Sequence, residues 1–115
     1  MSGLRVVVVD NDTAVLDLLL LDLGLEGHDI VATAECGEDA VRACDEHGPD
    51  VLVVDLRLGP GIDGLEVARR VAKPGLRVLI HTNYVNPAVV ASAEKVGAIV
   101  VEKGTLRALR RAICG

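Results

Sequence analysis

The feature that most constrains the fold is a regular alternation between short apolar runs and longer segments with helical spacing. The first run covers residues 4–9, and residues 51–54 are apolar at every position. Continuous, valine-rich runs are typical of strands that are buried on both faces of a parallel sheet. Three further runs predict strands at residues 30–34, 76–82 and 98–101.

Helical segments follow each of these runs. The expected helices cover residues 14–23, 38–47, 65–72, 87–96 and 106–113. Asp12 or Thr13 can cap the first helix, and Gly24 and Gly27 are expected to end it. Asn86 followed by Pro87 is a strong helix start. Five strands alternating with five helices indicate a doubly wound α/β fold with a parallel sheet, and we expect one domain over residues 1–115.

The composition excludes several functional classes. Tyr84 is the only aromatic residue, so a surface that stacks nucleic-acid bases is not available. The 17 acidic and 12 basic residues give a net charge of −5, which repels a polyphosphate. Asp17 and Asp22 interrupt the leucine-rich stretch before it reaches the roughly 18 apolar residues of a membrane helix. We therefore expect no direct nucleic-acid partner and no membrane segment.

The cysteines bear on the cellular compartment. Cys36, Cys44 and Cys114 are odd in number and fall in no metal-ligand spacing. The first residues show no basic region followed by an apolar core and a cleavage site. We expect reduced thiols and a cytoplasmic protein.

Polar side chains stand at the carboxyl ends of the expected strands, where function gathers in such folds. They are Asp10, Asn11, Asp12, Asp55, Thr82 and Lys103. Asp55 follows four apolar residues, and a carboxylate there is costly unless it is paired or bound to a cation. Clustered oxygen ligands suit Mg²⁺. A local role, such as a helix cap or a solvated charge, is open to each residue alone, and their convergence is what indicates a site.

An ordered set of motifs resembles the receiver domain of two-component response regulators. The set comprises VVVVDND at residues 6–12, PDVLVVD at 49–55, Asp63-Gly64, VLIHT at 78–82, Gly97-Ala98 and Lys103. The resemblance spans essentially the whole chain, in the right order. It implies a flavodoxin-like, five-stranded parallel sheet of order 2-1-3-4-5 with helices on both faces.

The resemblance implies that Asp55 accepts a phosphoryl group from a histidine kinase, a phosphotransfer protein or a small phosphodonor, and that the domain then switches conformation. It implies a phosphorylated signalling domain, not an enzyme beyond assisting its own phosphoryl transfer and dephosphorylation. Mg²⁺ is expected at Asp10, Asn11, Asp55 and the backbone carbonyl of Arg57. Thr82 and Lys103 are expected to contact the phosphoryl group. A homodimer or an output domain is expected to use the last helix.

Four departures from the family pattern bear on these expectations. Asn11 stands where a second acidic metal ligand is usual, which predicts weaker Mg²⁺ binding and slower phosphorylation. The loop at residues 58–64 looks one residue longer than the common form, and residues 97–103 look one residue shorter. Val100 replaces a usual aromatic ring, and Gly104 replaces a usual proline. We expect signal readout to differ on that side.

Three alternatives remain open. A haloacid-dehalogenase-like phosphatase would use Asp10 as nucleophile and Asp12 as general acid and base, but it leaves Asp55 unexplained. A pseudo-receiver would keep the fold as a binding module without phosphorylation, which Asn11 favours. The G-x-G-x-x-G pattern at residues 59–64 is a weak dinucleotide motif, since such a turn normally follows the first strand.

Two helices offer surfaces. The first helix carries more leucines than one buried stripe can hide, so we expect some of them to face outward. A kinase or phosphotransfer partner can dock on these leucines unless neighbouring elements of the fold cover them. Arg107, Arg110 and Arg111 of the last helix are expected to form a solvated face. Because the five strands use the whole chain, we expect a stand-alone receiver or a domain cut from a longer protein after this helix.

Overall fold

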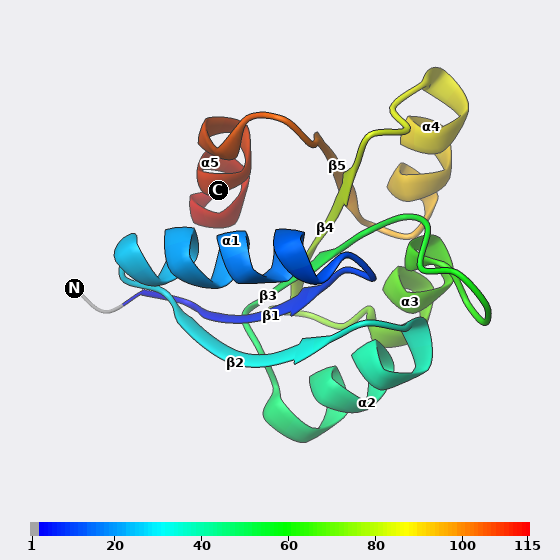
Figure 1. Ribbon diagram of the computed structural model, residues 1–115. Helices are drawn as coiled ribbons and strands as arrows, with labels where there is room; N and C mark the ends of the chain where they lie inside the picture. Colours follow the sequence, from blue (N-terminus) through cyan, green and yellow to red (C-terminus); the bar gives the residue numbers. More distant parts are fainter. Residues whose placement is uncertain (1–2) are drawn as a thin grey trace.

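The computed structural model describes residues 3–115 as one layered α/β unit (Figure 1). The strands are β1 (Arg5–Val9), β2 (Asp29–Ala34), β3 (Val51–Val54), β4 (Arg77–Thr82) and β5 (Ile99–Glu102). The helices are α1 (Thr13–Leu25), α2 (Gly37–His47), α3 (Gly64–Val71), α4 (Pro87–Lys95) and α5 (Leu106–Cys114). All neighbouring strands pair in parallel in the order β2-β1-β3-β4-β5. The predicted alternation and sheet order are confirmed.

The sheet is buried on both faces because its central strands are almost entirely valine, leucine and isoleucine. Along β1, Val6 and Val8 belong to the core on the α1 and α5 side, whereas Val7 and Val9 belong to the core on the α2, α3 and α4 side. Figure 1 shows the same division of the helices between the two faces. Each fully buried valine or leucine contributes about 1.5–3 kcal/mol relative to exposure in water. None of the helices in the described range is long and apolar enough to cross a membrane.

Local sequence accounts for the helix starts. The Asp12 carboxylate accepts the Ala14 N–H at 3.0 Å, and the Asn86 side chain accepts the Val89 N–H at 3.0 Å. Each cap satisfies a backbone donor that has no partner within the helix. The predicted starts at Asp12 and Asn86 are therefore confirmed.

The predicted end of α1 was wrong by two residues. The helix runs through Gly24 to Leu25, and the chain turns at Gly27, whose φ is 88°. One glycine inside a helix costs only about 1 kcal/mol relative to alanine. The burial of Leu19 and Leu23 on the same helix is worth more, so the helix continues.

Arg110 corrects the expectation of a fully solvated arginine face on α5. Its Nε donates to Asp22 Oδ2 at 3.1 Å, and its Nη2 donates to Asp22 Oδ1. The Asp22 side chain is only 8% exposed, and a buried carboxylate is costly unless it is paired. Arg110 therefore joins α5 to α1, while Arg107 and Arg111 remain exposed.

Candidate functional site

Parallel pairing brings two acidic residues together at the carboxyl edge of the sheet. Val9 of β1 pairs with Val54 of β3. The residues that directly follow these two strands, Asp10 and Asp55, therefore lie side by side. Lys103 reaches the same edge from β5, and its backbone N–H donates to the carbonyl of Thr82 at 2.9 Å. The site is thus assembled from residues far apart in the sequence.

The Lys103 ammonium binds both carboxylates at once. Its Nζ lies 2.8 Å from Asp10 Oδ2 and 3.0 Å from Asp55 Oδ2. The side chains of Asp10, Asp55 and Lys103 are only 2%, 9% and 15% exposed. One ammonium therefore faces two buried carboxylates, which leaves a net negative charge suited to a further cation.

The local environment shifts the pKa values of this cluster. Burial raises the pKa of Asp55, the hydrogen bond from Lys103 opposes this effect, and the nearby charge of Asp10 adds to it. For Lys103, burial disfavours the ammonium, but hydrogen bonds to Asp10 and Asp55 outweigh it and raise the pKa. Lys103 is therefore charged at neutral pH, and the ionised form of Asp55 depends on nearby positive charge.

A cleft of about 250 Å³ opens over these groups. Its lining residues are Asp10, Asn11, Asp12, Asp55, Arg57, Asn83, Tyr84 and Lys103. Asn83 was not predicted as a site residue, although it directly follows β4 at the same carboxyl edge of the sheet. A larger hollow of about 380 Å³ between α2 and α3 shares no lining residue with this cleft.

Arg57 and Tyr84 meet at the cleft. The guanidinium carbon of Arg57 lies 3.9 Å from the centroid of the Tyr84 ring, a distance typical of a cation–π contact. This contact joins the loop after β3 to the loop after β4. Only the backbone carbonyl of Arg57 was predicted to take part in the site, because no local pattern in the sequence reveals a side-chain contact between two loops.

Thr82 is the one predicted site residue that does not line the cleft. It is fully buried, and its Oγ1 accepts the Tyr84 N–H at 3.0 Å. The hydroxyl therefore lies behind the cleft wall and fixes the start of the loop that carries Tyr84.

His81 is buried beside this site. Burial lowers its pKa to about 4, and the positive charge of Lys103 adds to the effect. Within residues 3–115, Nδ1 of His81 is the only buried side-chain nitrogen or oxygen that lacks a hydrogen-bond partner. The ring is therefore neutral at physiological pH.

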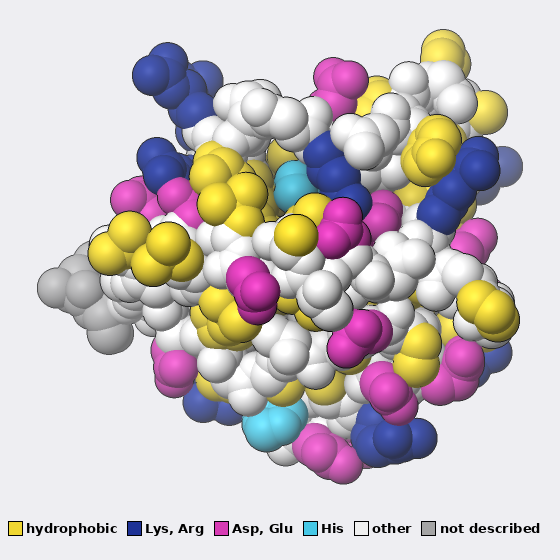
Figure 2. Space-filling view, viewed as in Figure 1, with side chains coloured by type: hydrophobic (Ala, Val, Ile, Leu, Met, Phe, Trp, Pro, Cys, Tyr) yellow, Lys and Arg dark blue, Asp and Glu magenta, His cyan; other side chains and the backbone are white. Residues whose placement is uncertain are grey.

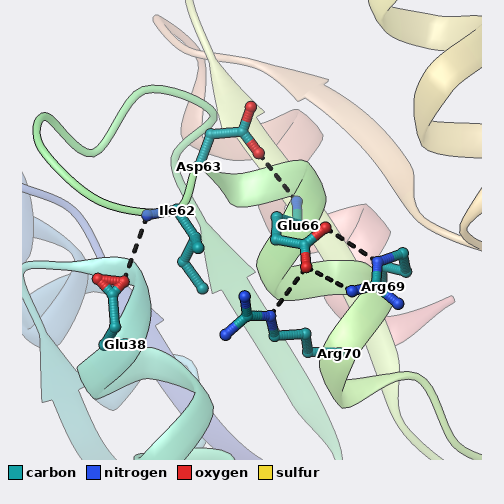
Figure 3. Close-up of polar contacts among 6 residues, drawn as sticks. All are labelled: Glu38, Ile62, Asp63, Glu66, Arg69 and Arg70. Atoms are coloured by element: carbon teal, nitrogen blue, oxygen red, sulfur yellow. Dashed lines mark hydrogen bonds and ion pairs between the residues drawn. The ribbon is translucent and has the colours of Figure 1, made fainter.

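The loop between β3 and α3 is anchored where it leads into α3 (Figure 3). The Ile62 N–H donates to Glu38 Oε2 on α2 at 3.3 Å, and the Asp63 carboxylate accepts the Glu66 N–H at 2.9 Å, which caps α3. Figure 3 also shows Glu66 paired with two arginines of α3. The extra length predicted for this loop therefore does not leave it unattached.

Two glycines of this loop have packing roles, which bears on the dinucleotide alternative. A Cβ on Gly64 would lie 2.3 Å from the carbonyl oxygen of Asp55, so only glycine fits beside the site. Gly61 has a φ of 100° and lies against the Glu38 carboxylate. A carboxylate at this turn repels a pyrophosphate, and the turn follows β3 instead of β1, so the glycine pattern serves loop packing.

The residues of the cleft fit a magnesium ion. Mg²⁺ is usually bound through one or two carboxylates together with water. Asp10 and Asp55 supply two carboxylates that Lys103 only partly neutralises, and Asn11 and Arg57 line the same cleft. No group of three His, Cys, Asp or Glu side chains suited to a metal occurs among the described residues.

Fold and site together define a signalling domain of flavodoxin-like architecture, with acids and a lysine at the carboxyl edge of the sheet. The chain belongs to the response regulator receiver domain family, whose model matches residues 6–111. The phosphatase alternative is therefore set aside.

Curated relatives match part of the chain. Transcriptional regulatory protein TrcR of Mycobacterium tuberculosis is 46% identical over 70 residues, which cover 61% of this chain and 26% of TrcR. Transcriptional regulatory protein AfsQ1 of Streptomyces coelicolor is 44% identical over 66 residues, which cover 57% of this chain and 28% of AfsQ1. The chain thus matches only about a quarter of the length of each relative.

Solved structures match the whole fold. The signal receiver domain of the putative response regulator NarL from Mycobacterium tuberculosis superposes with a TM-score of 0.88 at 28% identity, covering 99% of this chain and 95% of that one. A chain from the CheX–CheY–BeF₃–Mg²⁺ complex of Borrelia burgdorferi superposes with a TM-score of 0.89 at 22% identity, covering 98% and 89%. The second match supports the fold alone.

Proposed function

We propose that this domain accepts a phosphoryl group on Asp55 and thereby switches a response regulator. The observation that carries the proposal is the Lys103 ammonium held between Asp10 and Asp55. Asp55 lines an open cleft, so a phosphodonor can reach its carboxylate. The raised pKa of Asp55 reflects a buried anion that gains from added positive charge.

In the proposed reaction, a carboxylate oxygen of Asp55 attacks the phosphorus of the donor. The bond from phosphorus to the donor's histidine nitrogen, or to the acetate oxygen of acetyl phosphate, breaks, and the leaving group keeps the electron pair. An acyl phosphate forms on Asp55. Lys103 is placed to pair with an oxygen of the transferred group, and this charge stabilisation with positioning is most of what phosphoryl transfer requires.

Asp10, Asp55, the amide of Asn11 and the backbone carbonyl of Arg57 would hold Mg²⁺ in this proposal. When bound, the ion supplies positive charge that neutralises the phosphoryl oxygens. Asn11 brings no charge to the set, so we expect weaker metal binding than with an acid at this position.

The switch follows from charge. An acyl phosphate carries close to two negative charges where the Asp55 carboxylate carried one, so the contacts of the Lys103 ammonium with Asp10 and Asp55 must change. We propose that the Thr82 hydroxyl turns toward the phosphoryl group. Gly104 follows Lys103 with a φ of 112°, a value closed to proline, so this segment takes a path that a proline here would forbid.

We propose that residues 1–115 form one receiver domain, with a histidine kinase or phosphotransfer protein as its phosphodonor. The names of its relatives favour an output domain that regulates transcription. Cys36, Cys44 and Cys114 are all free thiols, which favours the cytoplasm as its compartment.

The test is to treat the chain with acetyl phosphate and Mg²⁺ and to map the modified residue by mass spectrometry. We expect label on Asp55, none after Asp55→Asn, and unchanged labelling in Asp45→Asn, a control on an exposed acid of α2. Label on Asp10 that survives Asp55→Ala would overturn the proposal. No adduct at saturating Mg²⁺ would instead make the chain a pseudo-receiver, the outcome that Asn11 favours.

A further inference from the structure

His81 is a buried polar side chain with no part in the proposed phosphoryl transfer. It lies on β4, directly before Thr82, and is only 5% exposed. Its Nδ1 has no hydrogen-bond partner, and no other buried side-chain nitrogen or oxygen of residues 3–115 is left in this way. Buried polar groups are almost always hydrogen-bonded, because an unpaired one loses its contacts with water and gains nothing in return. The partner of this nitrogen has to come from a nearby group that can move, or from water.

The pairing of the strands places His81 beside the candidate site. Ile80 of β4 pairs with Val54 of β3. The residues that directly follow them, His81 and Asp55, are therefore neighbours at the carboxyl edge of the sheet. Asp55 lines the cleft and His81 does not. His81 is thus a buried neighbour of the residue that we propose to be phosphorylated.

The ring of His81 shares one face of the sheet with Lys103. Successive side chains of a strand alternate between the two faces. Leu79, two residues before His81, belongs to the core on the α1 and α5 side. Val101, which pairs with His81 from β5, belongs to the same core and lies two residues before Lys103. Burial and the positive charge of Lys103 lower the pKa of His81 to about 4, and the negative charge of Asp10 opposes them. A neutral imidazole therefore lies near the ammonium of the site.

Lys103 has more donors than its present partners use. A lysine ammonium carries three N–H groups. Its Nζ lies 2.8 Å from Asp10 and 3.0 Å from Asp55, and its side chain is only 15% exposed, so water has little access to it. Figure 2 shows basic and acidic side chains gathered over the start of α1, next to the site. When Asp10 binds a cation, as the proposed function requires, the ammonium loses one of its two acceptors. A buried N–H then needs a new acceptor nearby.

A neutral histidine suits this task better than another acid would. One of the two ring nitrogens of a neutral imidazole is an acceptor. It takes a hydrogen bond from the ammonium without adding negative charge, so the charge of Lys103 stays available to the phosphoryl oxygens. A third carboxylate would compete for that charge, and an apolar side chain would offer no acceptor at all.

We propose that His81 is a positioning residue for Lys103, and that its Nδ1 accepts a hydrogen bond from the Lys103 ammonium when this ammonium leaves Asp10. The bond keeps the ammonium next to Asp55 while Asp10 turns to another partner. The purpose of this contact rests on the proposed function, but the contact itself can be tested without a metal and without phosphorylation.

The first experiment follows the histidine ring nitrogens by ¹⁵N NMR at about pH 8, above the ordinary histidine pKa of about 6.5. In the metal-free wild type, Nδ1 of His81 should be unprotonated and free. Asp10→Ala removes one acceptor of Lys103, so the Nδ1 signal should move toward that of a hydrogen-bonded nitrogen. His28 is the internal reference, because its Nδ1 accepts the Leu4 N–H at 3.1 Å, and its signal should not change. Adding Lys103→Met to Asp10→Ala should abolish the movement of the His81 signal.

A second experiment tests what the contact does. Wild-type chain with Mg²⁺ and beryllofluoride should show the same movement of the Nδ1 signal as Asp10→Ala. His81→Leu keeps the ring site filled but removes the acceptor, and it should slow the labelling of Asp55 by acetyl phosphate at least about tenfold, the loss typical of one hydrogen bond to a charged group. His81→Gln keeps an acceptor and should label at close to the wild-type rate.

Several results would overturn the proposal. They are a His81 ring protonated at Nδ1, a signal that Asp10→Ala leaves unchanged, and a movement that persists after Lys103→Met, since water would then be the partner. Labelling of Asp55 with an unchanged His81 signal would keep the proposed function and reject this contact. A moved His81 signal in Asp10→Ala without any label on Asp55 would support the contact and reject the proposed function.

Discussion

Replacing Lys103 by methionine tests the central feature of the site. The substitution keeps much of the length and apolar character of the side chain but removes the ammonium that binds Asp10 and Asp55. Two buried carboxylates are then left with no positive partner between them. We expect Lys103→Met to destabilise the metal-free fold strongly at neutral pH and much less in mild acid.

The size of the effect follows from the geometry. Two carboxylate oxygens bound to one ammonium lie within about 6 Å of each other, and their repulsion is worth about 3 kcal/mol at an effective dielectric constant of about 20. Removing one partner of a buried ion pair typically costs about 3–5 kcal/mol. We therefore expect the free energy of unfolding to fall by about 3 kcal/mol at pH 7.

The pH dependence has a definite sign. In the variant, burial and the charge of Asp10 raise the pKa of Asp55 with no hydrogen bond from Lys103 to oppose them. A carboxylate whose pKa is higher in the folded state than its unfolded value of about 3.9 binds more protons when folded, so stability falls as pH rises through that window. The loss in free energy of unfolding of Lys103→Met relative to the wild type should therefore be small near pH 4 and reach its full value at pH 7.

The assay is urea unfolding of the wild type and Lys103→Met at several pH values, with Lys95→Met on the exposed face of α4 as the control. Added Mg²⁺ should narrow the gap at pH 7, because a divalent cation supplies the missing charge. A loss below about 1 kcal/mol that does not change with pH would show that Asp10 and Asp55 are not coupled, and would refute the reasoning.

Three further predictions concern single positions. Asn11→Asp should tighten Mg²⁺ binding about tenfold by adding a charged ligand, as measured by calorimetric titration. Gly64→Ala should lower the free energy of unfolding by about 1–3 kcal/mol, because its Cβ would lie 2.3 Å from the carbonyl oxygen of Asp55. Tyr84 should change its fluorescence when beryllofluoride and Mg²⁺ bind, because it lines the cleft and stacks on Arg57.

Each of these has a contradicting result. Equal Mg²⁺ affinity in Asn11→Asp would exclude this position from the metal site. Gly24→Ala is the control, because a Cβ on Gly24 would meet no atom within 4 Å. If Gly64→Ala kept the full free energy of unfolding, the backbone beside Asp55 would be able to shift and make room for the Cβ. Unchanged Tyr84 emission would show that the ring takes no part in the conformational switch. Arg57→Ala gives the reference emission of a Tyr84 ring that does not stack on Arg57.

Much of this molecule was readable from its sequence because the signals are local. Apolar runs and helical spacing gave every strand and helix to within two residues, and Asp12 and Asn86 marked helix starts through hydrogen bonds to their own neighbours. The parallel order then predicted that Asp10 and Asp55 would meet, since both follow directly on neighbouring buried strands. These features depend on residues close in the chain or on the regular geometry of a sheet.

Contacts between elements were decided by tertiary packing alone. Whether Lys103 reached both acids, whether Arg57 stacked on Tyr84, and whether Arg110 was solvated depended on where separate loops and helices came to lie. The sequence of α1 showed that it had too many leucines to bury, but the packing of the sheet on one side chose which of them face solvent. Side-chain periodicity fixes which residues share a face of an element, whereas only packing against its neighbours determines which face is covered.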